Sequence, residues 1–252
     1  MTLWLIPLFV LITSAISAAL GMAGGLLLMG ALGLVAPPAL ALALHGFLQL
    51  MANGYRAYLL RSFAARSILG PYALAALLCT AAMFGLQVMA DRKQLYLLLG
   101  LVAVGGSLLA HVLPSSLERT PRFLRADRWQ GAVTCAALVT IATLTAGVAG
   151  PLLDVFFLRT NLDRHATVAT KAMTQSLSHI IKIAYVGMVA PRVLLAAEGW
   201  APVLIVAMAA TLVGSHIGGH VLDRMGERLF RRATRSVVLG IGLLYLTRGL
   251  LV

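Results

Sequence analysis

The sequence predicts an all-α polytopic membrane protein made of two inverted homologous repeats. Three observations lead to this fold class: the composition, the length of the apolar segments, and a repeat at half the chain length. Of the 252 residues, 60% are hydrophobic and 11% are charged, and the mean hydropathy is +0.94. Soluble domains contain about 45–50% apolar residues, so this chain has too few charged side chains to cover a water-facing surface of its size.

The apolar segments approach or exceed the length of a membrane-spanning helix, which is about 20 residues. Barrel strands would alternate apolar and polar side chains, whereas these segments are continuously apolar, and helices also satisfy the backbone in lipid. We therefore expect helices over segments 39–60, 67–90, 94–113, 129–146, 167–190, 200–222 and 236–252. Residues 3–20 lack the basic start of a signal peptide, and we expect a helix of the mature protein there.

The net charge is +12, from 20 Lys and Arg against 8 Asp and Glu. A basic chain can bind nucleic acid, but here most basic residues lie in short connections between apolar segments, as the positive-inside rule expects. We therefore expect a lipid bilayer around the chain and no nucleic-acid partner. Cys79 and Cys135 lie in apolar segments, where small core residues are a better interpretation than a disulfide.

A shift of 126 residues superimposes one half of the sequence on the other. The motif Gly-Met-Ala-Gly at 21–24 then aligns with Gly-Val-Ala-Gly at 147–150. The same shift aligns two polar series, which are His45, Gln49, Asn53, Arg56 and Lys171, Gln175, His179, Lys182. Because a single shift aligns both the glycine motifs and the polar series, the sequence indicates a duplication, with repeats at 1–126 and 127–252.

The glycine motifs interrupt apolar segments at 21–25 and 147–151. A helix-packing motif would explain the first alone, but Pro151 suits the first turn of a new helix and favours a break. The break is either a re-entrant hairpin or a full-span turn. If the chain turns back at both breaks, 13 Lys or Arg lie on one side of the membrane, in 61–66, 119–128, 159–164 and 224–235, against four on the other side.

This charge distribution favours the hairpins and both chain termini outside. Five full or partial passes in each half then invert the second repeat. Many secondary transporters place broken helices of inverted repeats around a site near the membrane midplane.

Each polar series has the spacing i, i+4, i+8 and i+11, which is one face of a helix. A Lys or Arg at the membrane centre costs about 2.5–3.5 kcal/mol on insertion scales and usually faces a cavity or a partner. We therefore expect two facing stripes around a cationic cavity that attracts a small anion. The alternative is that these residues pair with each other and only hold the helices together.

The expected substrate-binding side chains are His45, Gln49, Asn53, Lys171, Gln175 and His179. Backbone donors at the helix breaks, at Gly24, Gly25 and Gly150, add to this site. Arg56 and Lys182, near opposite helix ends, either line the pathway or snorkel to the interface. Asp154 either pairs with Lys171 or Arg159, or carries a coupling proton. The ion that is coupled to transport is either such a proton or another cation.

The motifs resemble a known family. The residues are Gly-Met-Ala-Gly-Gly-Leu-Leu-Leu at 21–28, Pro37-Pro38, Gly-Val-Ala-Gly-Pro-Leu-Leu at 147–153, and Ala169-Thr170-Lys171-Ala172 followed by Gln175, His179 and Lys182. Over nearly the whole chain they look like the TauE/SafE family of sulfite and sulfonate permeases. Ala23 departs from the more usual glycine run of that family. The resemblance implies a secondary transporter of sulfite, thiosulfate or an organosulfonate in the cytoplasmic (inner) membrane.

Two other classes of function are alternatives to a transporter of this kind. The sequence lacks HExxH, Gly-x-Ser-x-Gly and a pair of membrane aspartates, so we expect no catalytic residues and no enzyme. A passive anion channel, or a permease for carboxylates or other organic anions, is the nearer alternative. His216, His220 and Asp223 have a spacing that can ligate a metal, but the first repeat has no matching histidines, and we expect no metal and no cofactor.

Overall fold

The computed structural model describes residues 5–20, 23–86, 90–113, 119–195 and 200–251. Throughout this part of the chain the regular elements are helices and no strand is present, as the composition predicted. Among the described residues, four helices are long and apolar enough to cross a membrane, and these are Arg66–Leu86, Arg92–Val112, Ala201–Val221 and Arg232–Leu251. Several shorter apolar helices accompany them, which is typical of a multi-pass membrane protein.

The two halves of the chain have similar element orders. The first half forms α1 (Ile6–Leu20), α2 (Ala23–Val35), α3 (Pro38–Leu59), η2 (Arg61–Phe63), α4 (Arg66–Leu86) and α5 (Arg92–Val112). The second forms η3 (Arg122–Leu124), α6 (Trp129–Thr145), α7 (Gly150–Phe157), α8 (Arg164–Val189), α9 (Pro191–Leu195), α10 (Ala201–Arg224) and α11 (Glu227–Leu251). The short helix α9 lies between α8 and α10, at a place where the first half has only η2.

The chain reverses direction between α1 and α2. A Cβ placed on Gly24 would overlap the backbone oxygen of Thr13 and lie 2.6 Å from Cβ of Ser17. In one continuous helix Gly24 and Thr13 would be about 16 Å apart along the axis. Helix α2 therefore folds back along α1, which is the hairpin alternative for the first break.

A second reversal separates α6 from α7. Gly147 has φ of +80°, a left-handed conformation that glycine adopts without steric cost, and Pro151 lies in the first turn of α7. The backbone N–H of Ala126 donates to the carbonyl oxygen of Phe156 at 3.4 Å. The end of α7 therefore lies beside the residues that lead into α6, and the chain forms a hairpin here as well.

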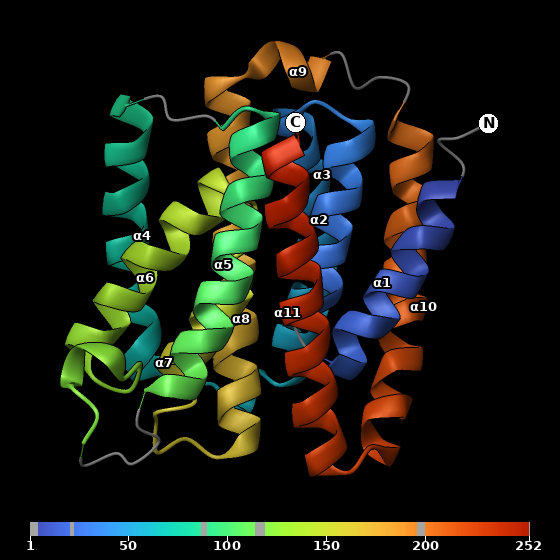
Figure 1. Cartoon of the computed structure of the whole chain (residues 1–252). Helices are drawn as coiled ribbons and strands as arrows, with labels where there is room; N and C mark the ends of the chain where they lie inside the picture. The colour runs from blue at the N-terminus through green and yellow to red at the C-terminus, as the bar shows by residue number, and fades with distance from the viewer. Residues whose placement is uncertain (1–4, 21–22, 87–89, 114–118, 196–199, 252) are drawn as a thin grey trace.

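Helices of the two halves pack in matched pairs. Helix α3 packs against α8 and α5 against α11, while α1 packs on α10 as α6 packs on α4. Added Cβ atoms at Gly249 and Gly242 would meet Leu97 and Val104, respectively, so α5 and α11 are antiparallel. Figure 1 shows these two helices side by side and running in opposite directions.

The basic connections gather at one end of the helix bundle. Figure 1 places residues 119–128 and the connections α3–α4, α7–α8 and α10–α11 at its lower end. The C-terminal end of α11 and the start of α1 lie toward the upper end. This is the grouping of connections on which the charge argument of the sequence depends.

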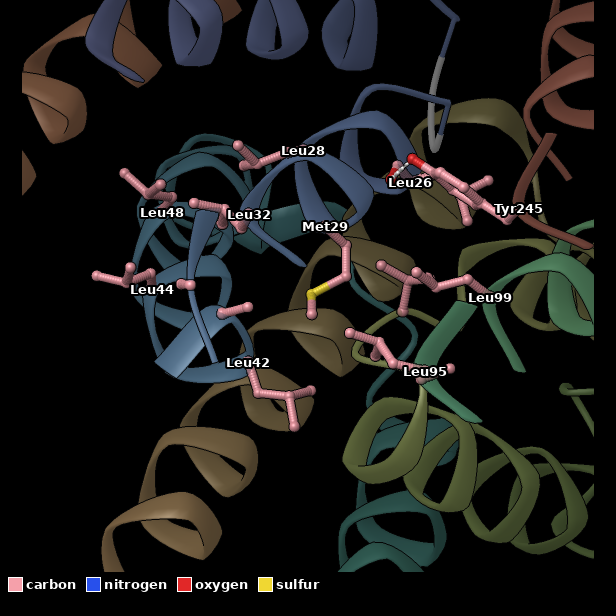
Figure 2. Packing of buried hydrophobic residues seen from close by; sticks show 14 of the residues in the cluster. Leu26, Leu28, Met29, Leu32, Leu42, Leu44, Leu48, Leu95, Leu99 and Tyr245 are labelled. Carbon is pink, nitrogen blue, oxygen red and sulfur yellow. Dashed lines mark hydrogen bonds between the residues drawn. The ribbon is translucent and has the colours of Figure 1, made fainter. Parts of the chain in front are cut away.

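Apolar side chains fill the interior and also cover the outside. Figure 2 shows Met29 of α2 among leucines of α3 and α5, with the hydroxyl of Tyr245 donating to the carbonyl oxygen of Leu26 at 2.8 Å. On the outer faces Leu78 of α4 and Leu244 of α11 are 64% and 62% exposed. Large apolar surfaces of this kind mark contact with another apolar phase, which for these helices is lipid.

Candidate functional site

The two polar stripes meet where α3 packs against α8. His45, Gln49 and Asn53 on α3 are buried, and so are His179 and Lys182 on α8. Burial takes these polar groups away from water, so they must bind each other or a ligand. These five side chains form one cluster, which is called the α3–α8 cluster.

Lys182 lies at the centre of the α3–α8 cluster and is 0% exposed. Its Nζ lies 2.9 Å from the carbonyl oxygen of Gly147 and 2.8 Å from Nδ1 of His45. No carboxylate forms an ion pair with Lys182 in the part of the chain that the structure describes. The snorkelling alternative for Lys182 is therefore wrong, because the side chain points inward and is fully covered.

The hydrogen bonds of His45 determine which ring nitrogen carries the proton. Its Nε2 lies 3.0 Å from the carbonyl oxygen of Gly25. A carbonyl can only accept, so Nε2 is the donor, and neutral His45 presents Nδ1 as the acceptor for Lys182. The resulting chain of hydrogen bonds runs from Gly147 through Lys182 and His45 to Gly25, and so joins the two glycine breaks.

His179 adds a second imidazole to the cluster. Its ring centroid lies 5.7 Å from that of His45, in an edge-on arrangement. Nδ1 of His179 is buried and has no hydrogen-bond partner among the described residues. Such an atom costs about 1–3 kcal/mol when unsatisfied, so this position favours a polar ligand that supplies the missing bond.

Gln49 lies against the first turn of α2. A Cβ added to Gly25 would be 3.1 Å from Nε2 of Gln49 and 3.8 Å from Nε2 of His45. Nδ2 of Asn53 donates to the backbone oxygen of Gln49 at 3.0 Å and to its Oε1 at 3.4 Å. Asn53 therefore turns the oxygen of Gln49 toward itself and leaves the amide N–H groups directed toward Gly25 and His45.

Lys171 is neutralised by Asp154, which lies on α7 and forms an ion pair with it. Of the alternatives for Asp154, pairing with Lys171 is the one the structure contains. Arg159 instead donates to the carbonyl oxygens of Ala110 and Leu113 at the end of α5, each at 3.1 Å. The expectation that Lys171 supplies the charge of the site needs correction, because Lys171 is bound to Asp154, whereas the fully buried Lys182 has no carboxylate partner among the described residues.

The remaining expected residues lie around this cluster. The missing side chain of Gly24 faces the backbone of α1, so this glycine serves helix packing. Gly150 is buried at the start of α7. Gln175 and Arg56 are partly exposed, and within the described residues no hydrogen bond connects either of them to the α3–α8 cluster.

Two features of the site were missed at the level of sequence. The carbonyl of Gly147 binds Lys182, and its only sequence signal is the alignment of the glycine motifs. Tyr72 of α4 shares a hydrogen bond of 3.2 Å with Ser178, which fixes the other side of α8. No spacing rule pairs these two residues, because they lie on different helices.

The histidines of α10 do not form a metal site in the described structure. The rings of His216 and His220 are 4.7 Å apart, and both residues are exposed. The side chain of Asp223 lies outside the described residues. No group of three potential metal ligands occurs within the searched part of the chain.

The variant Asp154→Asn should lower the free energy of unfolding by about 1–3 kcal/mol, because it leaves partly buried Lys171 without its partner. Thermal unfolding of the purified protein in detergent measures this loss. Adding Lys171→Met to Asp154→Asn should recover most of it, since the double variant has no unpaired charge. If the loss of unfolding free energy in the double variant equals the sum of the losses in the two single variants, the ion pair would be contradicted.

The fold and the α3–α8 cluster define a multi-pass helical membrane protein with a buried cation between two broken-helix hairpins. The family model described as Sulfite exporter TauE/SafE matches residues 6–245. The chain therefore belongs to this family, and the resemblance seen in its glycine motifs is confirmed. The family is one of transporters. No curated protein and no solved structure matches the chain.

Proposed function

We propose that the protein is a secondary transporter that moves a small sulfur-containing anion, namely sulfite, thiosulfate or an organosulfonate, across the cytoplasmic membrane. The observation that carries this proposal is Lys182, which is fully buried and lacks a carboxylate partner among the described residues. By the rise of 1.5 Å per residue, Lys182 lies only about 8 Å from the middle of α8. An ammonium there is costly, and a bound anion would compensate it.

The groups around Lys182 suit the oxygens of a sulfonate or sulfite. An ammonium has three donors, of which two point to His45 and Gly147, so one remains for the anion. The amide of Gln49 and the unpartnered nitrogen of His179 supply neutral donors. The proposed binding residues are Gly25, His45, Gln49, Asn53, Gln175, His179 and Lys182, with Gly150 as a backbone donor; Lys171, Asp154 and Arg56 lie along the pathway.

We also propose that repeats 1–126 and 127–252 are inverted copies. The matched packing of α1 on α10 and α6 on α4 supports a two-fold relation between the halves. Helices α3 and α8 are antiparallel as well, since His45 contacts Lys182 while Ala65, beyond the end of α3, bonds to Thr170 near the start of α8. The antiparallel pairs α3–α8 and α5–α11 support the inversion, because each pair consists of the corresponding helices of the two halves. Such repeats allow one half to rock against the other around a fixed site.

The proposed orientation places the lower end of Figure 1 in the cytoplasm. The connections gathered there carry most of the basic residues, and short cytoplasmic connections are enriched in Lys and Arg. Both chain termini then lie outside.

The variant Gln49→Ala/Gln175→Ala should lose uptake of the transported anion in proteoliposomes by at least about tenfold, since two amide donors are removed. A ligand-dependent thermal-shift screen over sulfite, thiosulfate, taurine, sulfoacetate and carboxylates first identifies the anion. Saturable counterflow distinguishes a carrier from a channel. Unchanged uptake by the double variant would refute the assignment of these glutamines, and stabilisation by carboxylates alone would refute the sulfur-anion class.

A further inference from the structure

Lys182 and His45 form a pair of bases that share one hydrogen bond. Nζ of Lys182 and Nδ1 of His45 are 2.8 Å apart, and Nε2–H of His45 is occupied by the carbonyl oxygen of Gly25. Only one proton can lie between the two nitrogens. The pair therefore exists either as a neutral amine beside a neutral imidazole or as one cation shared between them.

The charge of this pair depends on what else is in the site. A buried cation without a counter-charge is unfavourable by several kcal/mol, so an empty site favours the neutral pair. A bound anion reverses this preference, because an anion in the same low-dielectric interior attracts the proton strongly. Binding of an anion and binding of a proton to this pair are therefore thermodynamically linked, and each strengthens the other.

The other ionisable groups around the pair do not replace it in this role. His179 on α8 is the nearest, with its ring 5.7 Å from that of His45. It provides no counter-charge, and because an imidazole is a weaker base than an amine, the first proton goes to the Lys182–His45 pair. Asp154 on α7 is bound to Lys171. The hydroxyl of Tyr72 on α4 is bound to Ser178. Helix α2 contains no ionisable side chain, and the remaining groups on helices that pack against α3 or α8 include Arg56, Cys79, Cys135, Tyr185, Arg192, His216 and His220.

We infer that the Lys182–His45 pair takes up one proton with each anion, so that the protein is a proton–anion cotransporter whose proton travels in the substrate site itself. This inference rests on the proposed function. In the binding step a proton moves from water on the open side to the amine of Lys182, and in the release step it returns to water on the other side with the anion. No group is oxidised or reduced. The carboxylate of Asp154 is not needed as the proton carrier.

Calorimetric titration of the full chain in detergent tests the inference. Methanesulfonate and thiosulfate are suitable probes, because both are anions of strong acids and carry no exchangeable proton near neutral pH. The titration is repeated near pH 7 in two buffers with different heats of ionisation. The difference between the measured heats should correspond to an uptake of about one proton for each anion bound. Binding of either probe without proton uptake would overturn the inference and leave the proposed function intact, whereas absence of binding for every sulfur anion would overturn both.

The variant Lys182→Arg keeps the positive charge that binds the anion but removes the group that takes up the proton. Arginine stays protonated in proteins, so the variant should still bind the probe anion while the number of protons taken up falls to near zero. Asp154→Asn is the matched comparison, because it removes the other candidate proton carrier. In this variant the number of protons taken up per bound anion should stay at about one, even if its affinity for the anion changes. Loss of proton uptake in Asp154→Asn would assign the proton to the carboxylate and overturn the inference. If Lys182→Arg does not fold, His179→Gln takes its place: proton uptake that persists in both Asp154→Asn and His179→Gln leaves the Lys182–His45 pair as the carrier, and its loss in His179→Gln would overturn the inference.

Discussion

Lys182→Met should strongly weaken anion binding and leave the protein folded. Methionine has nearly the same length and fits an apolar environment, but it brings no charge and no donor. Hydrogen bonds to charged groups contribute roughly 1.5–3 kcal/mol each, so the affinity for the anion should fall by at least on the order of 100-fold. Stability should change little, because an apolar methionine avoids the cost of burying the polar amine, which offsets the donor that Gly147 and His45 each lose.

Equilibrium binding of the anion identified by the thermal-shift screen measures the first effect, and the unfolding temperature without ligand measures the second. Lys171→Met is the matched control, since it makes the same chemical change on the same helix. It should mainly reduce stability, because it leaves Asp154 unpaired, and should weaken binding far less than Lys182→Met. If Lys182→Met binds the anion normally and Lys171→Met does not, the cation that binds the anion is Lys171.

Gly24→Ala should prevent the protein from folding. The added Cβ would overlap the backbone oxygen of Thr13, and a backbone atom cannot move aside without separating α1 from α2. The expected loss of stability exceeds about 4 kcal/mol, which is the range of exceptional single substitutions. Little monodisperse protein should be recovered in detergent by size-exclusion chromatography.

The control for Gly24 is Gly105→Ala in α5, where no atom lies within 4 Å of the added Cβ. Replacing a helical glycine with alanine stabilises a helix by roughly 0.5–1 kcal/mol, so this variant should be recovered at least as well as the unaltered protein. Normal folding and normal uptake of Gly24→Ala would contradict the hairpin packing of α1 and α2. It would also reopen the expectation that Gly24 acts as a ligand donor.

Much of this architecture follows from one-dimensional patterns. Continuous apolar segments predicted the helices, since lipid requires every backbone polar group to be bonded within a helix. The period of the polar residues placed His45, Gln49 and Asn53 on one face of α3. The constant offset between the halves paired this face with that of α8, and the glycine motifs marked both breaks.

Tertiary structure alone decided which cation the protein leaves unpaired. Lys171 and Lys182 have the same chemistry and lie on the same face of α8, so no sequence pattern separates them. The difference arises because α7 folds back and carries Asp154 to Lys171, while Lys182 reaches His45 and the carbonyl of Gly147. Such pairing depends on the depth and rotation of each helix against its neighbours. Those quantities come from side-chain packing between helices, whereas the sequence by itself determined the helices, their polar faces and the positions of their breaks.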